Sequence, residues 1–323
     1  YCLLPICYHN FMIYKTFDQF LDFELLDSGN GYRLERWSNI RLKRPDPQII
    51  WQPSLPQSEW DNVDAEFVGS GEKGRWNKRP GLATQWEVYF RPDIKFVAKL
   101  TPFKHTGIFA EQAANWEWFT ELTTPSFGHP SYPSSTVGGE NIGGPLRILN
   151  LFAYTGGATM VLTRLGHSVT HVDASKPAIA WAKENQALNK FPPESIRWIL
   201  DDALKFAQRE LKRGQKYDGI IMDPPAFGHS PTGKTWKFNR DLPILLDTCV
   251  NLLSDDAKFL LINGYATNAS ALSLNNLAED AFAERGGKIE AGEITLKHQI
   301  KSPHNKDITH REISTGIFAR WQN

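Results

Sequence analysis

The residues with the clearest chemical potential are 223–227 (DPPAF), which directly follow an apolar run over 217–222. Proline fixes φ and carries no N–H, so the proline carbonyls of this motif are acceptors held in place. The Asp223 carboxylate and one such carbonyl can hold both hydrogens of an amino group and leave its lone pair pointing outward. An aromatic ring at this site can stack on a planar base. The motif predicts a site that presents a nitrogen to an electrophile, with a catalytic set of Asp223, Pro224, Pro225 and Phe227.

Glycines and acidic residues follow three further apolar runs. Gly156 and Gly157 come after the first, and paired glycines let the backbone turn sharply beside a ligand. Asp173 comes after the second, where a carboxylate can bind both hydroxyls of a ribose. Asp201 and Asp202 come after the third, where they can accept from an adenine amino group. Taken singly, each of these glycines and acidic residues is equally typical of an ordinary turn or helix cap. Likewise, 223–227 taken alone could be a rigid loop whose aromatic residue packs in the core. Together they predict one adenosine site, because strand carboxyl ends meet at one edge of an α/β sheet.

The elements that would position these groups alternate between strands and helices after Pro145. Strands are expected over 147–152, 168–172, 196–200, 217–222, 258–263, 288–297 and 313–321. Helices are expected over 158–165, between Ser175 and Asn189, over 203–213 up to Gly214, and from a cap at Asp241 to 253. This alternation predicts a parallel sheet with helices on both faces.

Before residue 125 the pattern changes to short, aromatic-rich strands. They are expected over 32–37, 49–51, 66–68, 86–90 and 96–100, with a helix over 110–122. Polar interruptions favour a half-exposed antiparallel sheet. The segment 69–81 (GSGEKGRWNKRPG) is expected as a basic loop. A stretch dense in Pro, Gly and Ser then predicts the division of the chain: a small α+β domain over 1–125, a linker over 126–145 and the α/β domain over 146–323.

Composition narrows the class of protein. The 323 residues are 41% hydrophobic, enough for one large core and a smaller one. Lys+Arg and Asp+Glu both number 36, so the formal net charge is zero and gives no overall attraction to nucleic acid or membrane. A local basic face is still compatible with this balance. Three cysteines without framework spacing favour a reducing cytoplasm. No apolar run approaches the roughly 18–20 residues of a membrane span. Either residues 1–11 belong to the protein or translation begins at Met12.

Three segments resemble a group of class I S-adenosylmethionine-dependent methyltransferases that modify large-subunit ribosomal RNA, a group that includes the cytosine carbon-5 and guanine N7 enzymes. Residues 149–159 (LNLFAYTGGAT) resemble its first motif, 223–227 its fourth, and 106–118 (TGIFAEQAANWEW) the segment before the first. The resemblance covers about residues 100–320. It implies a seven-stranded Rossmann-like sheet with its last strand antiparallel, and S-adenosylmethionine as the methyl donor.

The resemblance also implies roles for single residues. The methionine portion of the cofactor would be faced by Phe152, Tyr154, Thr155, Gly156 and Gly157. The ribose would be held by Asp173 with Ala174, and the adenine by Asp202 with the Ala203 backbone. Gln112 would reach the cofactor from the preceding segment, and Asp223 would border it.

The chain departs from the cytosine carbon-5 enzymes at one point. Those enzymes need a Cys nucleophile just past the fifth strand, where this chain has Asn263 to Asn268 and no Cys. Cys249 lies inside the preceding helix and is expected to be a buried thiol. A nitrogen acceptor is therefore favoured over carbon 5 of cytosine.

A second candidate region is 229–240 (HSPTGKTWKFNR), where cations alternate with aromatics. Such a segment can grip phosphates and stack bases; a solvated loop is the equal alternative. The substrate-binding candidates in it are Lys234, Trp236, Lys237 and Arg240. The histidines at 298, 304 and 310 lack zinc spacing and are expected on the surface or in strands, so no metal site is predicted.

The sequence predicts a cytoplasmic S-adenosylmethionine-dependent methyltransferase that acts without a metal on a base nitrogen of RNA, with ribosomal RNA favoured. The neutral charge leaves open a methyltransferase for a protein side chain or a small molecule. A cofactor-binding protein without activity is a further alternative, against which the intact 223–225 motif argues. The sequence specifies no oligomeric state.

Overall fold

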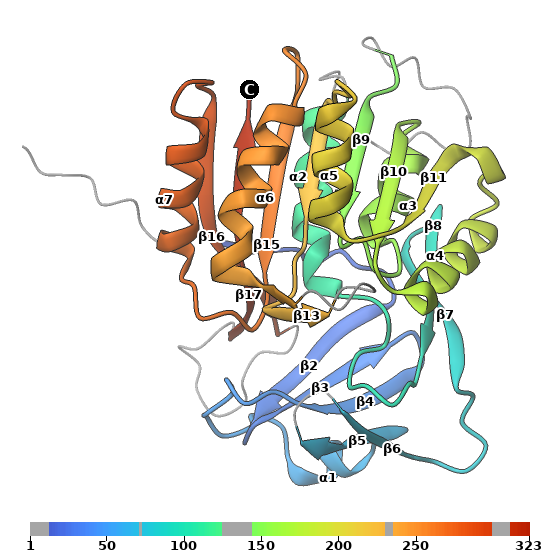
Figure 1. Cartoon of the computed structure of the whole chain (residues 1–323). Helices are drawn as coiled ribbons and strands as arrows, with labels where there is room; N and C mark the ends of the chain where they lie inside the picture. Colours follow the sequence, from blue (N-terminus) through green and yellow to red (C-terminus); the bar gives the residue numbers. More distant parts are fainter. Residues whose placement is uncertain (1–12, 71–72, 125–143, 230–234, 299–310) are drawn as a thin grey trace, which may run out of the picture.

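The computed structural model describes residues 13–70, 73–124, 144–229, 235–298 and 311–323, and its centre is an eight-stranded sheet (Figure 1). The strand order is β1-β16-β17-β15-β12-β9-β10-β11. The bounds are β1 (Ile13–Thr16), β9 (Arg147–Leu151), β10 (Ser168–Asp173), β11 (Ile196–Leu200), β12 (Gly219–Met222), β15 (Phe259–Gly264), β16 (Lys288–Lys297) and β17 (Glu312–Gln322). Only β17 runs antiparallel to its neighbours among these strands. The Rossmann-like sheet is confirmed, and β1 adds an eighth strand to the seven expected.

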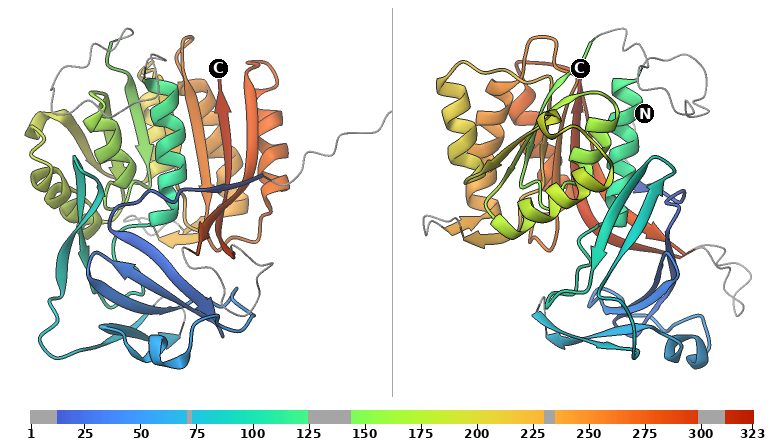
Figure 2. Two further views of the ribbon diagram at one scale, coloured as in Figure 1. Left: turned by 180° about the vertical axis from the view of Figure 1, so that it is seen from behind. Right: turned by 90° about the vertical axis from the view of Figure 1, so that its right-hand side faces the viewer.

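Helices cover both faces of this sheet (Figure 2). One face carries α2 (Ala113–Thr123), α3 (Gly157–Arg164) and α4 (Lys176–Leu188), and the other carries α5 (Ala203–Lys212), α6 (Phe238–Leu252) and α7 (Ala271–Phe282). A hydrophobic cluster lies on each side of the sheet. Two short 3-10 helices, η1 (Ala110–Gln112) and η2 (Pro193–Ser195), precede α2 and β11. No helix in the described residues is long and apolar enough to cross a membrane.

Most of the expected boundaries agree with the structure to within a few residues. Ser175 caps α4 by accepting from the Ala178 N–H, and Gly214 ends α5 at a φ of 68°. One expectation was wrong, and one helix was missed. Asp241 does not cap α6, because the helix begins at Phe238 and the Asp241 carboxylate accepts from the Lys237 N–H (2.8 Å). Helix α7 was not expected, although its buried residues recur at helical spacing.

The small domain lies against the edge of the large sheet where the parallel strands end (Figure 1). Its five-stranded sheet follows the order β2-β3-β4-β5-β6, and β7 and β8 form a separate hairpin. The bounds are β2 (Phe23–Gly29), β3 (Tyr32–Trp37), β4 (Ile40–Pro45), β5 (Ala65–Ser70), β6 (Lys73–Lys78), β7 (Gln85–Arg91) and β8 (Ile94–Lys99), with a short helix α1 (Gln57–Asp61). The pairing is antiparallel except between β4 and β5.

Two predictions for the small domain were wrong. Residues 49–51 form no strand, because the carbonyls of Ile49 and Trp51 accept instead from Gly31 and Asn30 in the β2–β3 turn. The basic segment 69–81 is largely strand rather than loop, because β6 pairs with β5 along its whole length and the Trp76 ring meets Phe67 edge-on at 5.3 Å. The predicted linker lies mostly outside the described residues.

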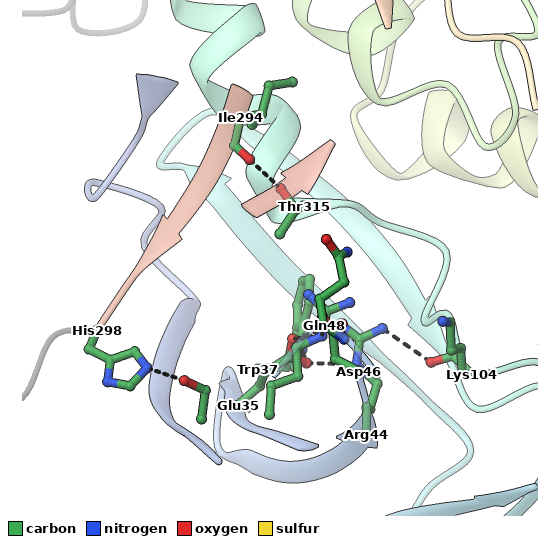
Figure 3. Close-up of polar contacts among 11 residues, drawn as sticks. Glu35, Trp37, Arg44, Asp46, Gln48, Lys104, Ile294, His298 and Thr315 are labelled. Atoms are coloured by element: carbon green, nitrogen blue, oxygen red, sulfur yellow. Dashed lines mark hydrogen bonds and ion pairs between the residues drawn. The ribbon is translucent and has the colours of Figure 1, made fainter. Parts of the chain in front are cut away.

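Buried polar contacts hold the small domain together and join it to β16 (Figure 3). The fully buried Glu35 carboxylate accepts from Arg44 Nη2 (2.7 Å) and Trp37 Nε1 (2.9 Å). Although burial opposes ionisation, the charges of Arg44 and Arg33 hold the pKa of Glu35 below its ordinary value. His298, expected on the surface or in a strand, is buried just past β16 and lies 2.7 Å from the Ser28 hydroxyl.

The β7–β8 hairpin docks along α4. The Trp181 indole donates to the Val97 carbonyl (2.8 Å), and the Asn185 amide accepts from the Val97 N–H (2.9 Å). Gly107 passes beneath the Trp181 ring with a φ of 95°, and a Cβ at Gly107 would lie 2.1 Å from that ring. Only glycine fits this position without displacing the indole.

We expect Gly107→Ala to destabilise the protein more than Gly81→Ala. Both glycines have positive φ, but a Cβ at Gly81 would have no other atom within 4 Å. Gly81→Ala should therefore cost about 1–2 kcal/mol of unfolding free energy from backbone strain alone. Gly107→Ala adds the collision with Trp181, worth about 1–3 kcal/mol more. Urea unfolding monitored by tryptophan fluorescence measures both, and equal losses would contradict the tight junction.

Candidate active site

The register of the large sheet places four side chains in one row. Leu151 of β9 is paired with Val172 of β10 and Met222 of β12, and Met222 is paired with Ile262 of β15. The residues that follow this row are Phe152, Asp173, Asp223 and Asn263. All four therefore lie at the carboxyl edge of the sheet that faces the small domain.

The turn after β9 has an unusual backbone. Phe152 and Tyr154 have positive φ values of 56° and 50°, and Gly156, at 84°, is the N-cap residue of α3. Positive φ is rare outside glycine, and such strain gathers at functional sites. A Cβ at Gly157 would lie 2.5 Å from the Trp116 ring, so the turn packs tightly on α2.

Asp173 stabilises this turn from the end of β10. Its Oδ2 accepts from the Tyr154 N–H (2.8 Å) and its Oδ1 from the Ser175 N–H (2.7 Å). Burial raises the pKa of Asp173, although these backbone hydrogen bonds oppose the rise. The Ala174 N–H is a further donor to this carboxylate, which still leaves one of its four lone pairs for a ligand hydroxyl.

The two acids after β11 have different surroundings. Asp202 caps α5 by accepting from the Lys205 N–H (3.0 Å) through one oxygen. Asp201 pairs with Arg209 and accepts from the Asp202 N–H (2.8 Å). Asp202, with Ala203 directly after it, is therefore the less engaged of the two acids.

A cavity lies between the segment 107–112 and the strand ends. Six of the predicted site residues line it: Gln112, Phe152, Tyr154, Thr155, Gly157 and Asp223. Asp173, Ala174, Asp202 and Ala203 belong to the ends of the next two strands and not to this lining, and Gly156 forms the turn beside it. Asn150, Asn263 and Phe109 also line the cavity and were not predicted. Asn263 could have been found from the sequence, because it ends its strand as Asp223 does.

Asp223 is half-buried at the cavity wall, and burial together with the charge of Glu111 raises its pKa to about 7. The Pro225 carbonyl accepts from Trp236 Nε1 (2.8 Å), and the Trp236 ring packs on Phe152 at 5.0 Å. The Pro224 carbonyl is also engaged, since the isolated parallel bridge between Pro225 and Tyr265 uses it, so each of the two carbonyls retains one lone pair for an amino group. Trp236 therefore stabilises the 223–227 motif, and its indole N–H is already engaged within the protein.

The segment 229–240 is not a loop throughout. Strands β13 (Phe227–His229) and β14 (Thr235–Lys237) form a hairpin that leads into α6. Phe227 is 55% exposed and Lys237 is exposed, whereas Arg240 pairs with Asp241 (2.7 Å). Lys234 lies outside the described residues.

Cys249 is completely buried on α6, as expected, and burial raises the pKa of its thiol. The position past β15 is taken by Tyr265, whose ring lies 6.4 Å from that of Phe109. The described residues hold no group of three His, Cys, Asp or Glu side chains suited to a metal ion.

Comparison with solved structures decides the family. The crystal structure of the SAM-dependent methyltransferase from Agrobacterium tumefaciens is 38% identical to the chain, with a TM-score of 0.85 over 96% of the chain and 93% of that protein. The chain belongs to the S-adenosylmethionine-dependent methyltransferases. SMU.776, a protein crystallised with SAH, has a TM-score of 0.64 at 16% identity over 94% of the methyltransferase and 76% of its own chain, so it shares the fold. No family model matches the methyltransferase.

A relative with a named substrate matches part of the methyltransferase. The ribosomal RNA large subunit methyltransferase K/L of Shewanella sp. (strain MR-4) is 37% identical over 172 residues. These are 52% of the chain and 21% of that relative, so the chain spans about a fifth of its length.

The edge of the sheet suits S-adenosylmethionine by its own chemistry. Gly156 turns the chain at a φ that side chains rarely adopt, which brings backbone close to a ligand. Carboxylates with unused lone pairs end β10 and β11. Groups that could pair with the donors and acceptors of an adenosine therefore lie at the strand ends next to the cavity.

We expect Asp173→Ala to weaken S-adenosylmethionine binding about ten- to a hundred-fold, the value of a lost hydrogen bond to a charged group. Asp201→Ala is the matched control, because it also removes a carboxylate that accepts a backbone N–H but one that is already paired with Arg209. Isothermal titration on folded variants measures both affinities. An unchanged affinity in Asp173→Ala would remove the ribose role from this residue.

Proposed function

We propose that this methyltransferase methylates a base nitrogen of RNA, with ribosomal RNA as the favoured substrate. The observation that carries the proposal is the 223–227 motif directly after β12, in which Asp223 lines the cavity and the Phe227 ring is 55% exposed. The partial match to a ribosomal RNA methyltransferase supports the same substrate class. A cytoplasmic location, where ribosomal RNA is found, belongs to this proposal.

In the proposed site each strand end binds a different portion of the cofactor or the acceptor. Tyr154, Thr155, Gly156 and Gly157, with Phe152, would hold the methionine portion of S-adenosylmethionine, and Gln112 would reach it from η1. Asp173 with Ala174 would hold the ribose, and Asp202 with Ala203 the adenine. S-adenosylmethionine supplies an activated methyl group, so what the protein must add is positioning. Asp223 and the Pro224 carbonyl would accept from an amino group, and Phe227 would stack on its ring.

The proposed RNA contact on the small domain is the outer strand β6. Lys73 and Arg75 are exposed and two residues apart, so they project from the same face of the strand. Lys78 is exposed as well, whereas Arg79 pairs with Asp64 (3.1 Å). Lys237, on the β13–β14 hairpin, would extend this contact toward Phe227.

We expect Asp223→Asn to reduce methyl transfer by about a hundred-fold or more, because a misplaced acceptor costs on that order, with little change in S-adenosylmethionine affinity. Since the carboxylate is the form that accepts, transfer by the unaltered protein should rise with pH through about 7, where Asp223 ionises. Asp202→Asn is the contrasting variant, expected to weaken cofactor binding and to spare turnover at saturation. Radiolabelled transfer and titration, side by side across pH 5.5–8.5, test this; equal losses of binding and turnover would place Asp223 in the cofactor shell instead.

The charge reversal Lys73→Glu/Arg75→Glu should lower methylation of total RNA about ten-fold and reduce its logarithmic salt slope by about two, one unit per phosphate contact. Cofactor affinity should be unchanged. The control is Lys212→Glu/Lys216→Glu, which reverses two exposed lysines at the end of α5 far from the small domain. Unaltered RNA methylation in the first variant would mean that β6 does not bind RNA. Transfer to protein but not to RNA would establish the alternative substrate class.

A further inference from the structure

A buried hydrogen-bond chain runs from β17 to the floor of the cavity. Arg320 is 3% exposed, and its Nε and Nη2 both donate to Asn115 Oδ1 (2.9 and 2.6 Å). Asn115 is completely buried on α2, and its Nδ2 donates to Gln112 Oε1 (2.9 Å) and Asn263 Oδ1 (2.8 Å). Gln112 and Asn263 line the cavity.

The chemistry of Arg320 sets the direction of this chain. A guanidinium has donors and no acceptor, so the atom of Asn115 that it contacts must be the oxygen. Burial lowers the pKa of Arg320 to about 10, which leaves it charged at neutral pH. Glu290 lies 3.5 Å from Arg320 Nη1, and Lys15 of β1 pairs with Glu290 (2.8 Å). The guanidinium is therefore also held by an ion pair that does not involve Asn115.

The orientation of Asn115 then fixes the two amides that line the cavity. Because the Asn115 nitrogen donates to both, Gln112 and Asn263 must turn their oxygens toward it. Their NH₂ groups are left facing the other way, and neither nitrogen donates to a group within the described part of the chain. Two amides from distant segments, both in the lining of the cavity, thus have NH₂ groups turned away from Asn115.

We propose that Gln112 Nε2 and Asn263 Nδ2 form a donor pair that binds the carboxylate of the methionine portion of S-adenosylmethionine, and that Arg320 acts through Asn115 as their positioning residue. This inference rests on the cofactor site and not on the proposed RNA substrate.

The cavity lining favours a carboxylate at this pair. It contains no Lys or Arg, and its one charged side chain is Asp223. An anion in this cavity therefore needs neutral donors, which amide NH₂ groups and the first N–H groups of α3 can supply. The amino group of the methionine portion is itself a donor and cannot accept from these amide NH₂ groups.

The test is Asn115→Asp. Aspartate keeps the size of the side chain and its contact with Arg320, but an ionised carboxylate donates nothing to Gln112 or Asn263. Both amides should then rotate and turn their oxygens toward the ligand. Affinity for S-adenosylmethionine, measured by isothermal titration, should fall about ten-fold or more, as for a lost hydrogen bond to a charged group.

The deciding comparison uses decarboxylated S-adenosylmethionine, which lacks only the carboxylate. The unaltered protein should bind S-adenosylmethionine more tightly than this analogue, and Asn115→Asp should lose that preference. The affinity of Asn115→Asp for the analogue should stay within about two-fold of that of the unaltered protein, the scatter of a neutral contact. Equal loss for both ligands, or unchanged affinity for both, would overturn the inference. If Asn115→Asp does not fold, Asn263→Ala and Gln112→Leu make the same comparison with one donor removed at a time. If both of these variants keep the preference for S-adenosylmethionine over the analogue, the inference is overturned.

Discussion

The in-register pairing of the parallel strands is the constraint on which the site depends. Leu151, Val172, Met222 and Ile262 form one row across four strands, so the residues after them share one edge. A shift of one residue along any strand would move its functional side chain by about 3.3 Å, more than the length of a hydrogen bond. The apolar runs before these residues thus do more than fill the core, since their pairing also sets the positions of Asp173, Asp223 and Asn263.

Two further layers of contact support this edge. From the sheet side, the Arg320–Asn115 hydrogen bonds join β17 to α2 and orient the amides at the cavity floor. From the small domain, the β7–β8 hairpin docks along α4, and the Asn185 Nδ2 donates to the Thr155 carbonyl (2.9 Å) within the strand-end turn. The Thr155 hydroxyl also donates to the Gly107 carbonyl, in the segment that follows the hairpin. The turn after β9 is therefore held by groups from both parts of the chain, which fits a backbone with positive φ at the alternate positions Phe152, Tyr154 and Gly156.

The sequence was most informative where local pattern and chemistry coincide. The strands and helices from 147 to 222, the cap at Ser175 and the 223–227 motif could all be located, because each depends on neighbouring residues. The eighth strand β1 could not, since four residues of mixed polarity become a strand only beside β16. The same holds for the 227–237 hairpin, the use of the Pro225 carbonyl by Trp236, and the Gln112–Asn115–Asn263–Arg320 contacts, whose members are up to 208 positions apart in the chain and meet only after folding.

Strand β1 and helix α2 bracket the small domain, and both belong to the packing of the large sheet. Two polypeptide crossings therefore join the parts, and the docked hairpin adds a third attachment. These attachments restrain the movement of the small domain relative to the large sheet. Under the proposed function, most of the motion needed to bring a nucleotide to Asp223 would then fall to the RNA, through rotation of the base out of its stack. Bases in loops, bulges and frayed ends, which need little energy to unstack, would be favoured over those inside a stable duplex.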